Sequence, residues 1–332
     1  MPTWSTYLRI FIFTALLSIL LLYLFILLVD PYDNVPFSLP LEREPISTNQ
    51  RFAYPSLARK PGFDSAVIGT STARLLKPER LNELTGNNWV NLAMNSATAY
   101  EQIEMLNLFL RHHPGAKHIV IGIDDAWCRP GKEIQKFTFR PFPPWMYDEN
   151  RWNDLLYLFN DKALENAVRL VEYWAGKREA KYDGTGYRDF TEDFGEYDIT
   201  VIKEKLSLGL YKQNELAPNK LILQNEDIDD RFLYGAHSLL ASRLSSFSNV
   251  ELTVLFMPLH ANYLHRSAAN YKNCKARILR IGGNHQNVKF IDRMQIDEMT
   301  TDDQNYWDPL HFTSETAVIL ERIIHRNSAS RR

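Results

Sequence analysis

Two short segments, far apart in the chain, carry side chains from which a serine nucleophile and its base could be built. The first is Gly69-Thr70-Ser71-Thr72, a turn of small residues directly after a short apolar run. Such a turn exposes the Ser71 hydroxyl near the start of a helix, where backbone N–H groups stabilise a developing oxyanion. Taken alone, the same turn is also typical of a serine that only caps a helix.

The second segment, Trp307-Asp308-Pro309-Leu310-His311, precedes the last helical stretch of the chain. Asp308 and His311 are three residues apart, so the carboxylate can hold one imidazole nitrogen while the other nitrogen points away. A lone Asp-x-x-His could equally cap the final helix or form a surface ion pair. Together with Ser71, the two residues would form a catalytic triad in which the serine attacks an acyl group and the histidine takes its proton.

The two segments can meet only in a fold that brings them together, and the apolar pattern predicts such a fold. Five short apolar runs are typical of buried strands: Ser65–Ile68, Trp89–Leu92, His118–Ile123, Leu252–Met257 and Val288–Ile291. Helical patterns cover Tyr100–His112, Asp227–Ser246, Ala261–Leu279 and Ser314–His325. This alternation predicts an α/β sandwich with parallel strands and right-handed crossovers, whose ligands gather at the carboxyl ends of the strands.

The order of these segments resembles the SGNH (GDSL-like) hydrolase superfamily, in particular its membrane-anchored bacterial members. The family's Gly-Asp-Ser block is similar to Gly69-Thr70-Ser71, and its late Asp-x-x-His matches Asp308 to His311. Its Asn-x-x-x-Ser-Gly block is similar to Asn91–Ser96, and its Gly-x-Asn-Asp block to Gly122–Asp125. The resemblance covers about 63 to 128 and 250 to 325. It implies a flavodoxin-like three-layer α/β/α sandwich, a Ser71, His311 and Asp308 triad, and no cofactor.

Two positions depart from the family's pattern where the oxyanion would bind. Ser96 stands in place of the usual glycine, and it can still donate its backbone N–H if its conformation permits. Asp124 stands in place of the usual asparagine, and an ionised aspartate cannot donate a hydrogen bond. We expect an oxyanion hole from Ser71, Ser96 and Asp124, unless Asp124 has another role, such as positioning Arg74 or a substrate hydroxyl.

Three further residues are candidates for substrate contact. Arg74 and Asn95 belong to the blocks that carry the serine and the oxyanion donor. His260 follows a predicted strand, so its loop leaves the sheet at the carboxyl edge.

The segment from about 130 to 223 interrupts the alternation of strands and helices, and we interpret it as an insertion. It contains closely spaced aromatic residues from Phe137 to Trp152, an amphipathic run from Arg151 to Arg178, and the acidic, aromatic stretch Tyr182–Tyr197. These aromatics could form a lid or a binding wall. They could also pack the insertion onto the sheet or face a lipid surface.

Near the N-terminus, residues 10–29 form an uncharged apolar run whose length predicts one transmembrane helix. Arg9 begins the run and Asp30-Pro31 ends it, and no small-residue cleavage site of a signal peptide follows. Arg9 before the span and Asp30 and Asp33 after it favour a cytoplasmic N-terminus, residues 1–9. The main domain would then lie outside the cytoplasm, on a bacterial inner membrane.

The rest of the chain is predicted to follow as a stalk, one domain and a tail. Residues 30–62 contain several prolines and predict an extended stalk, 63–326 an SGNH-like domain, and 327–332 a polar tail.

Composition limits the partners. A net charge of −2 offers no attraction to a nucleic-acid backbone, so we expect no nucleic-acid partner. The only cysteines are Cys128 and Cys274, which lack the spacing of a zinc site and leave one disulfide open. No cluster suggests a metal.

These observations favour a membrane-anchored extracytoplasmic esterase or O-acyltransferase. The resemblance implies that it acts on O-acyl groups, in particular acetyl groups, of a glycan, with membrane polysaccharide machinery as a candidate partner. The alternative is a glycan-binding or scaffold protein that kept the fold and lost the chemistry, as the residues at 96 and 124 would allow.

Overall fold

The structure is a computed structural model, and it describes residues 3–207 and 233–329. Its internal contacts divide the chain into two compact units. Unit 1 comprises Met1–Ser56 and Pro143–Gly184, and unit 2 comprises Leu57–Phe142 and Thr185–Arg332. The first boundary falls within helix α2 (Gln50–Arg59).

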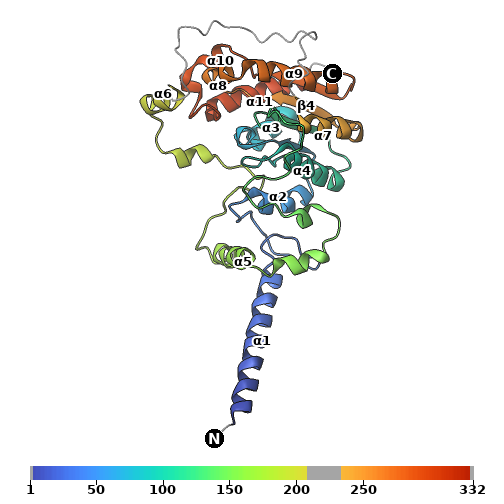
Figure 1. Ribbon diagram of the computed structural model, residues 1–332, viewed down its shortest axis with the longest axis vertical. Helices are drawn as coiled ribbons and strands as arrows, with labels where there is room; N and C mark the ends of the chain where they lie inside the picture. The colour runs from blue at the N-terminus through green and yellow to red at the C-terminus, as the bar shows by residue number, and fades with distance from the viewer. Residues whose placement is uncertain (1–2, 208–232, 330–332) are drawn as a thin grey trace. The chain divides into compact units, whose positions relative to one another are not determined.

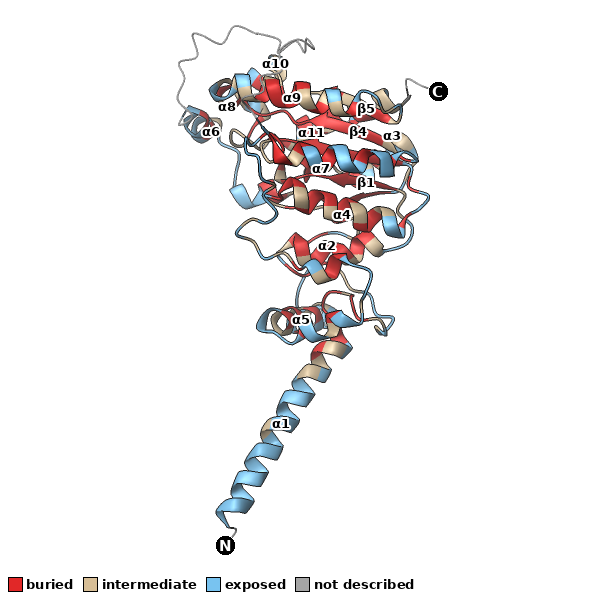
Figure 2. Cartoon of the chain, turned by 45° about the vertical axis from the view of Figure 1, so that its right-hand side comes forward, coloured by how far each residue is buried: buried red, intermediate tan, exposed pale blue. Residues whose placement is uncertain are grey.

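Unit 2 is an α/β unit built on one five-stranded parallel sheet in the order β2-β1-β3-β4-β5. The strands are β1 (Ser65–Ile68), β2 (Trp89–Asn91), β3 (His118–Ile123), β4 (Glu251–Phe256) and β5 (Val288–Asp292). Every residue of β1, β2 and β3 is buried, as Figure 2 shows in red. The five strands expected from the sequence are confirmed. They could be recognised because parallel strands buried on both faces consist of continuous apolar runs.

Eight α-helices accompany the sheet in the described part of unit 2 (Figure 1). They are α3 (Pro78–Thr85), α4 (Ala99–His112), α6 (Ile199–Ser207), α7 (Gly235–Leu244), α8 (Ala261–Arg266), α9 (Ala268–Gly282), α10 (Glu298–Thr301) and α11 (Ser314–Ala329). The helix expected over Ala261–Leu279 is in fact two helices, because Ser267 leaves the helical conformation. Of the helix expected over Asp227–Ser246, residues 227–232 lie outside the described part of the chain.

Buried polar contacts hold helices of unit 2 in place. Helix α11 contacts α3 through Glu321, whose carboxylate accepts hydrogen bonds from the Arg80 guanidinium and, at 2.6 Å, from the backbone N–H of Lys77. Helix α4 begins with a capping box, in which Thr98 and Glu101 each bond the other's backbone N–H. These contacts fix the helices that flank the strand ends.

The topology places three candidate segments at one edge of the sheet. Ser71 follows β1, Ser96 follows β2 and Asp124 follows β3, and all three strands run parallel. The carboxyl ends of parallel strands meet at the same edge, which is where sheets of this class bind ligands.

Unit 1 is organised around the end of an apolar helix. Helix α1 (Trp4–Val29) ends at the residue expected from the sequence and begins six residues before the expected position 10. It is long and apolar enough to cross a membrane. Its last turns pack against α5 (Asp161–Trp174), with Val29 and Leu170 in a shared apolar cluster.

Two segments differ from the organisation expected from the sequence. Residues 30–62 are not extended throughout, since they include helix α2 and buried side chains such as Tyr32 and Tyr54. The described part of the expected insertion is divided, because Pro143–Gly184 belongs to unit 1 and the flanking residues belong to unit 2. Residues 208–223 of that insertion lie outside the described residues.

Candidate active site

The loop after β1 holds Ser71 at the start of a short 3-10 helix, η1 (Ser71–Ala73). Gly69 permits this tight turn, because a Cβ there would lie 2.6 Å from the Cβ of Ala73. Thr70 caps the turn by accepting a hydrogen bond from the backbone N–H of Thr72. Ser71 itself is half-buried, so its hydroxyl is held by the turn and remains reachable.

The structure brings Ser71, His311 and Asp308 together in one chain of hydrogen bonds. His311 Nε2 lies 2.8 Å from Ser71 Oγ, and His311 Nδ1 lies 2.7 Å from Asp308 Oδ2. If Nδ1 donates to the carboxylate, Nε2 is the acceptor that faces the serine hydroxyl. This is the geometry of a nucleophile, a base and a residue that orients the base.

Asp308 is held as a carboxylate. Burial by itself raises its pKa, but the hydrogen bond from His311 and those from the backbone N–H groups of Leu310 and His311 outweigh burial, and the pKa lies below its usual value. An ionised Asp308 fixes the imidazole tautomer and stabilises an imidazolium that forms beside it.

Backbone contacts shape the loop that carries Asp308 and His311. The backbone N–H of Trp307 donates to the carbonyl of His311 at 2.8 Å, and Tyr306 pairs with Phe312 in a short antiparallel bridge. The loop therefore closes on itself and presents both triad side chains in one direction.

His260 supports this loop from the end of β4. Its backbone N–H donates to the carbonyl of Pro309, its Nε2 lies 3.1 Å from Asp303 Oδ1, and its Nδ1 accepts from the backbone N–H of Asn262. Burial lowers the pKa of His260, although Asp303 opposes the shift. His260 is 2% exposed, and both ring nitrogens are engaged within the protein. Its contact with substrate stays a prediction.

Arg74 and Asn95 bind each other. Arg74 Nη1 donates to Asn95 Oδ1 at 2.7 Å, and the Arg74 guanidinium lies 4.6 Å from the centre of the Phe190 ring. Arg74 is buried and Asn95 is half-buried, and neither residue lines the cavity beside Ser71. Substrate contact through these two side chains stays a prediction.

Aromatic rings pack around the triad histidine. The Phe190 ring meets His311 edge to face, with centres 5.4 Å apart, and the Phe194 ring lies 6.1 Å away. Both residues belong to the 3-10 helix η4 (Phe190–Phe194). The motifs in the sequence did not assign these two residues to the site.

Ser96 adopts the backbone conformation that a glycine favours. Its φ is 53°, in the left-handed region that side chains other than glycine rarely occupy. This explains structurally why the resemblance expects glycine here and how a serine takes its place. Ser96 lines the cavity beside Ser71, so its position agrees with the expected oxyanion hole.

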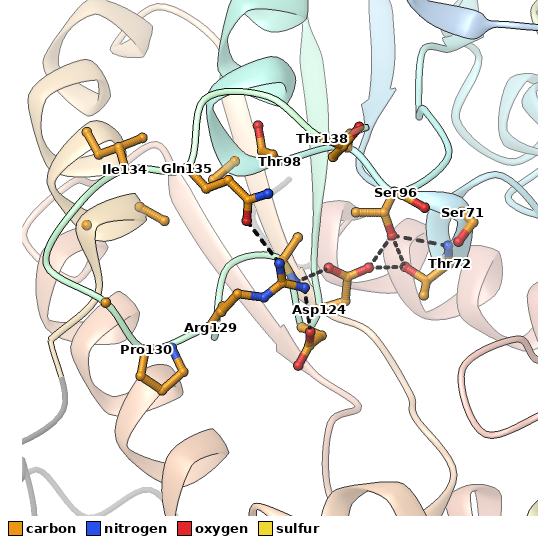
Figure 3. A pocket seen from close by; sticks show the side chains of 18 of the residues that line it. Ser71, Thr72, Ser96, Thr98, Asp124, Arg129, Pro130, Ile134, Gln135 and Thr138 are labelled. Carbon is orange, nitrogen blue, oxygen red and sulfur yellow. Dashed lines mark hydrogen bonds and ion pairs between the residues drawn. The ribbon is translucent and has the colours of Figure 1, made fainter. Parts of the chain in front are cut away.

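Asp124 has a different environment from the one expected of an oxyanion donor. Its Oδ2 accepts hydrogen bonds from the hydroxyls of Thr70 and Thr72, the second at 2.9 Å, and its Oδ1 accepts from the backbone N–H of Ala126 (Figure 3). Burial raises the pKa of Asp124, and these hydrogen bonds oppose the rise. The side chain thus fastens the Ser71 turn to the end of β3, and both of its oxygens already have partners.

A cavity of about 570 Å³ opens beside Ser71 (Figure 3). Its floor comes from the strand ends, with Ser71, Ser96 and Asp124, and one wall comes from the segment 129–139. In that wall, the Arg129 guanidinium donates to Gln135 at 2.9 Å and lies 3.3 Å from Asp125. The lining mixes hydroxyl, carboxylate, guanidinium and apolar groups, so it can bind a polar ligand through hydrogen bonds.

A disulfide fixes the start of this wall. Cys128 is bonded to Cys274 of α9, and both cysteines are buried. The carbonyl of Cys128 also accepts a hydrogen bond from Asn270 at 2.8 Å. The pairing that the sequence left open is therefore present.

Within residues 3–207 and 233–329, no group of three or more histidine, cysteine or acidic side chains is arranged to hold a metal ion.

No model of a known protein family matches the chain, and no curated protein matches its sequence. Among solved structures, the chain is similar to “a putative platelet activating factor” from Streptococcus pneumonia, with 11% sequence identity and a TM-score of 0.40. The match covers 83% of this chain and 90% of that chain. We therefore base the proposed function on the residues of the site itself.

Proposed function

We propose that the chain is a serine esterase or O-acyltransferase of the SGNH type, with Ser71 as nucleophile, His311 as base and Asp308 as the residue that orients the base. The observation that carries the proposal is the continuous hydrogen-bonded chain from Ser71 Oγ through the imidazole to the Asp308 carboxylate, with distances of 2.8 and 2.7 Å. The strand order and the position of Ser71 after β1 support a flavodoxin-like three-layer sandwich.

The chemistry proceeds in two halves. Ser71 Oγ forms a bond to the carbonyl carbon of an acyl ester while its proton passes to His311 Nε2. The bond to the leaving alcohol then breaks, and His311 returns the proton to that alcohol. An acyl-enzyme remains. In the second half, His311 removes a proton from the acceptor as the acceptor oxygen bonds to the acyl carbon, the bond from that carbon to Ser71 Oγ then breaks, and His311 returns the proton to Ser71 Oγ.

The oxyanion of each tetrahedral intermediate lies at the strand ends. Backbone N–H groups of Ser71 and Ser96 are the donors, because both residues line the cavity at this edge. Asp124 acts indirectly in this scheme, since its carboxylate fixes the turn through Thr70 and Thr72.

The acceptor decides the reaction class. Water gives an esterase, and a sugar hydroxyl bound in the cavity gives an O-acyltransferase. The hydroxyl and carboxylate groups of the lining suit a neutral polyol, in agreement with the O-acyl glycans that the resemblance implies.

The same proposal places the site outside the cytoplasm of a bacterium, on a chain anchored in the inner membrane by α1 with its N-terminus inside. The charges that flank the apolar helix support this orientation. The buried Cys128–Cys274 disulfide supports it independently, because disulfides persist in oxidising compartments.

One observation favours a second function, a glycan-binding protein without catalysis. Asp124 replaces the asparagine of the family's pattern, and both carboxylate oxygens accept hydrogen bonds within the protein. The oxyanion hole then has no side-chain donor from Asp124, which would weaken stabilisation of the intermediate.

Turnover of acetyl esters separates the two functions. The full chain in lipid nanodiscs is mixed with 4-nitrophenyl acetate or an O-acetylated oligosaccharide, and release of product is followed with and without an added glycan acceptor. We expect turnover that disappears in Ser71→Ala and persists in Ser242→Ala, an exposed serine of α7. A wild-type rate equal to that of Ser71→Ala contradicts the enzyme and favours the binding protein.

A further inference from the structure

Within unit 1, residues of the segment 153–159 cover one side of helix α1. The 3-10 helix η3 (Asn153–Leu158) lies beside α1, and the Tyr23 hydroxyl donates to the carbonyl of Leu155 at 2.6 Å. The Tyr23 ring also meets the Phe159 ring edge to face, with centres 5.5 Å apart. The segment 153–159 is therefore fixed at the level of Tyr23.

Tyr23 does not lie at the C-terminal end of α1. Tyr23 precedes Val29 by nearly two turns, or about 9 Å along the axis. The part of α1 before Tyr23 is almost wholly exposed, and at 1.5 Å per residue it is about 28 Å long. This is close to the thickness of a hydrocarbon core, so a membrane boundary near Tyr23, where η3 lies, places the span about six residues before the expected 10–29. Arg9 then lies within about 8 Å of the other end of the span, where its long side chain can reach the headgroups.

Around η3, unit 1 exposes an apolar patch, which consists of Phe37, Trp152, Leu156, Tyr157 and Phe159. Leu156 is 80% exposed and Trp152 is 65% exposed, while the other three are about half exposed. Exposed apolar side chains gathered in this way mark a site of interaction in soluble and membrane proteins alike. The rings are ordered, since Phe37 packs on Trp152 and Tyr157 stacks on Trp145.

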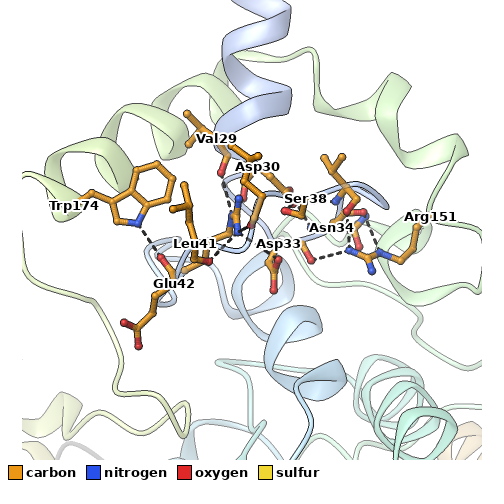
Figure 4. A network of polar contacts seen from close by, with 12 residues as sticks. Val29, Asp30, Asp33, Asn34, Ser38, Leu41, Glu42, Arg151 and Trp174 are labelled. Atoms are coloured by element: carbon orange, nitrogen blue, oxygen red, sulfur yellow. Dashed lines mark hydrogen bonds and ion pairs between the residues drawn. The ribbon is translucent and has the colours of Figure 1, made fainter.

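A polar network fixes the chain between α1 and the patch (Figure 4). Asp30 ends α1 with a φ of 49° and accepts hydrogen bonds from the Ser38 hydroxyl and from the backbone N–H groups of Asn34 and Val35. The Arg43 guanidinium donates to the carbonyls of Val29 and Asp30, each at 3.0 Å.

The other half of this network reaches the segment before η3. The Arg151 guanidinium donates to the carbonyls of Asp33, Asn34 and Val35, each at 3.1 Å. Helix end, loop and η3 are therefore tied together, so the patch keeps its position relative to α1.

We propose that this apolar patch lies in the interfacial layer of the membrane that α1 crosses, in the leaflet nearer the Val29 end of the helix. Three observations select lipid as its occupant. The patch continues the exposed apolar surface of α1, it lies at the level where the hydrocarbon ends, and tryptophan and tyrosine are the residues enriched at that boundary. Unit 1 is then held on the bilayer by α1 and by the patch, so that α1 does not act as a simple tether.

The proposal rests on α1 spanning a membrane and does not depend on the proposed catalysis. Spin labelling tests it on the full chain in nanodiscs of phosphatidylcholine and phosphatidylglycerol. The two native cysteines are paired, so Leu156→Cys introduces one reactive thiol for a nitroxide. Leu20→Cys in α1 serves as the hydrocarbon reference, and Ile319→Cys in α11 serves as the aqueous reference, since both side chains are exposed in the protein alone.

The readout is the ratio of collisions with oxygen, which concentrates in hydrocarbon, to collisions with a water-soluble nickel complex. We expect the ratio at Leu156→Cys to lie several-fold above that at Ile319→Cys and to approach that at Leu20→Cys. A ratio equal to that at Ile319→Cys overturns the proposal, because the patch then faces water. Low collision rates with both reagents also overturn it, because another protein surface then covers the patch.

A second measurement needs no label. In vesicles of brominated phosphatidylcholine, the difference in emission between the full chain and Trp152→Phe reports Trp152 alone. We expect this difference spectrum to be quenched relative to vesicles without bromine, and an unchanged difference spectrum contradicts contact with lipid. Neither measurement uses enzyme activity, so the outcomes of both are independent of the function of Ser71.

Discussion

The carboxylate of Asp124 accepts a hydrogen bond from the hydroxyl of Thr72 at 2.9 Å, directly beside the turn that presents Ser71. Thr70 donates to the same oxygen, so two threonines flank the serine and point to one buried acid. This relationship gives Asp124 a positioning role that the comparison with an asparagine does not suggest.

The variant Asp124→Ala is expected to loosen the turn. It leaves the hydroxyls of Thr70 and Thr72 and the N–H of Ala126 without their partner, which costs about 1–3 kcal/mol of unfolding free energy when such groups stay buried. Esterase turnover falls with it, because the hydroxyl of Ser71 is no longer held. Urea unfolding and ester hydrolysis measure the two effects, and a variant with wild-type values of both refutes this role.

The variant Asp124→Asn tests the charge of the same group. Burial raises the pKa of Asp124 above its usual value of 3.8. A carboxyl group whose pKa is raised on folding stabilises the fold below its unfolded pKa, and this contribution is lost as pH rises through the folded pKa. Asparagine does not titrate, so the Tm of the variant relative to wild type rises as pH increases above the usual carboxyl pKa of 3.8. A difference in Tm that does not change with pH contradicts the assignment.

The variant Asp308→Asn is expected to lower kcat by about 10²–10⁴, because an amide no longer fixes the imidazole tautomer. The pKa of Asp308 is lowered in the fold, so its carboxylate stabilises the protein above pH 3.8 and loses that effect as pH falls through the folded pKa. The stability difference between wild type and variant therefore shrinks in acid. Asp302→Asn, an exposed carboxylate nearby, is the matched control and should leave kcat unchanged.

The variant Phe190→Leu removes the ring that meets His311 edge to face. Leucine keeps most of the apolar volume, but the imidazole gains freedom to rotate away from Ser71, so kcat is expected to fall by about tenfold with little change in KM. Phe290→Leu, whose ring stacks on Phe256 within the sheet, is the control. Equal kinetics for the two variants would show that Phe190 does not position the histidine.

Removal of the disulfide in Cys128→Ser/Cys274→Ser is expected to destabilise the protein by about 2–5 kcal/mol, because the bond closes a long loop in the unfolded chain. Turnover also decreases, since Arg129 and the cavity wall follow directly after Cys128. Calorimetry with and without reductant measures the first effect. If the oxidised wild type and the variant have the same Tm, the disulfide does not stabilise the protein and the prediction is wrong.

The sheet could be predicted from the sequence because each strand is a short apolar run bounded by polar residues, and burial on both faces makes such runs continuous. The end of α1 at Val29 could also be predicted, since Asp30-Pro31 stops helix and hydrophobicity together. The meeting of Ser71 with His311 agrees with the order of the motifs along the chain.

Other features depend on contacts that no local pattern encodes. The ring of Phe190 reaches His311 from a segment that the motifs do not cover. The hydrogen bonds that Arg74, Asn95 and His260 make within the protein could not be predicted from the sequence either, and their contact with substrate stays a prediction. Likewise, periodicity could predict an amphipathic run over Arg151–Arg178, but it could not predict that this run packs beside α1. Pairing between distant residues depends on the whole fold, and single-sequence patterns report only local geometry.

Covalent labelling shows whether Ser71 is a nucleophile that His311 activates. The full chain in nanodiscs is treated with a fluorophosphonate, and intact mass and peptide mapping locate the adduct. We expect one adduct, on Ser71, that is absent in Ser71→Ala, strongly slowed in His311→Ala and unchanged in Ser242→Ala. A folded wild-type protein that gains no adduct, or gains it equally with and without His311, would contradict a serine nucleophile activated by this histidine.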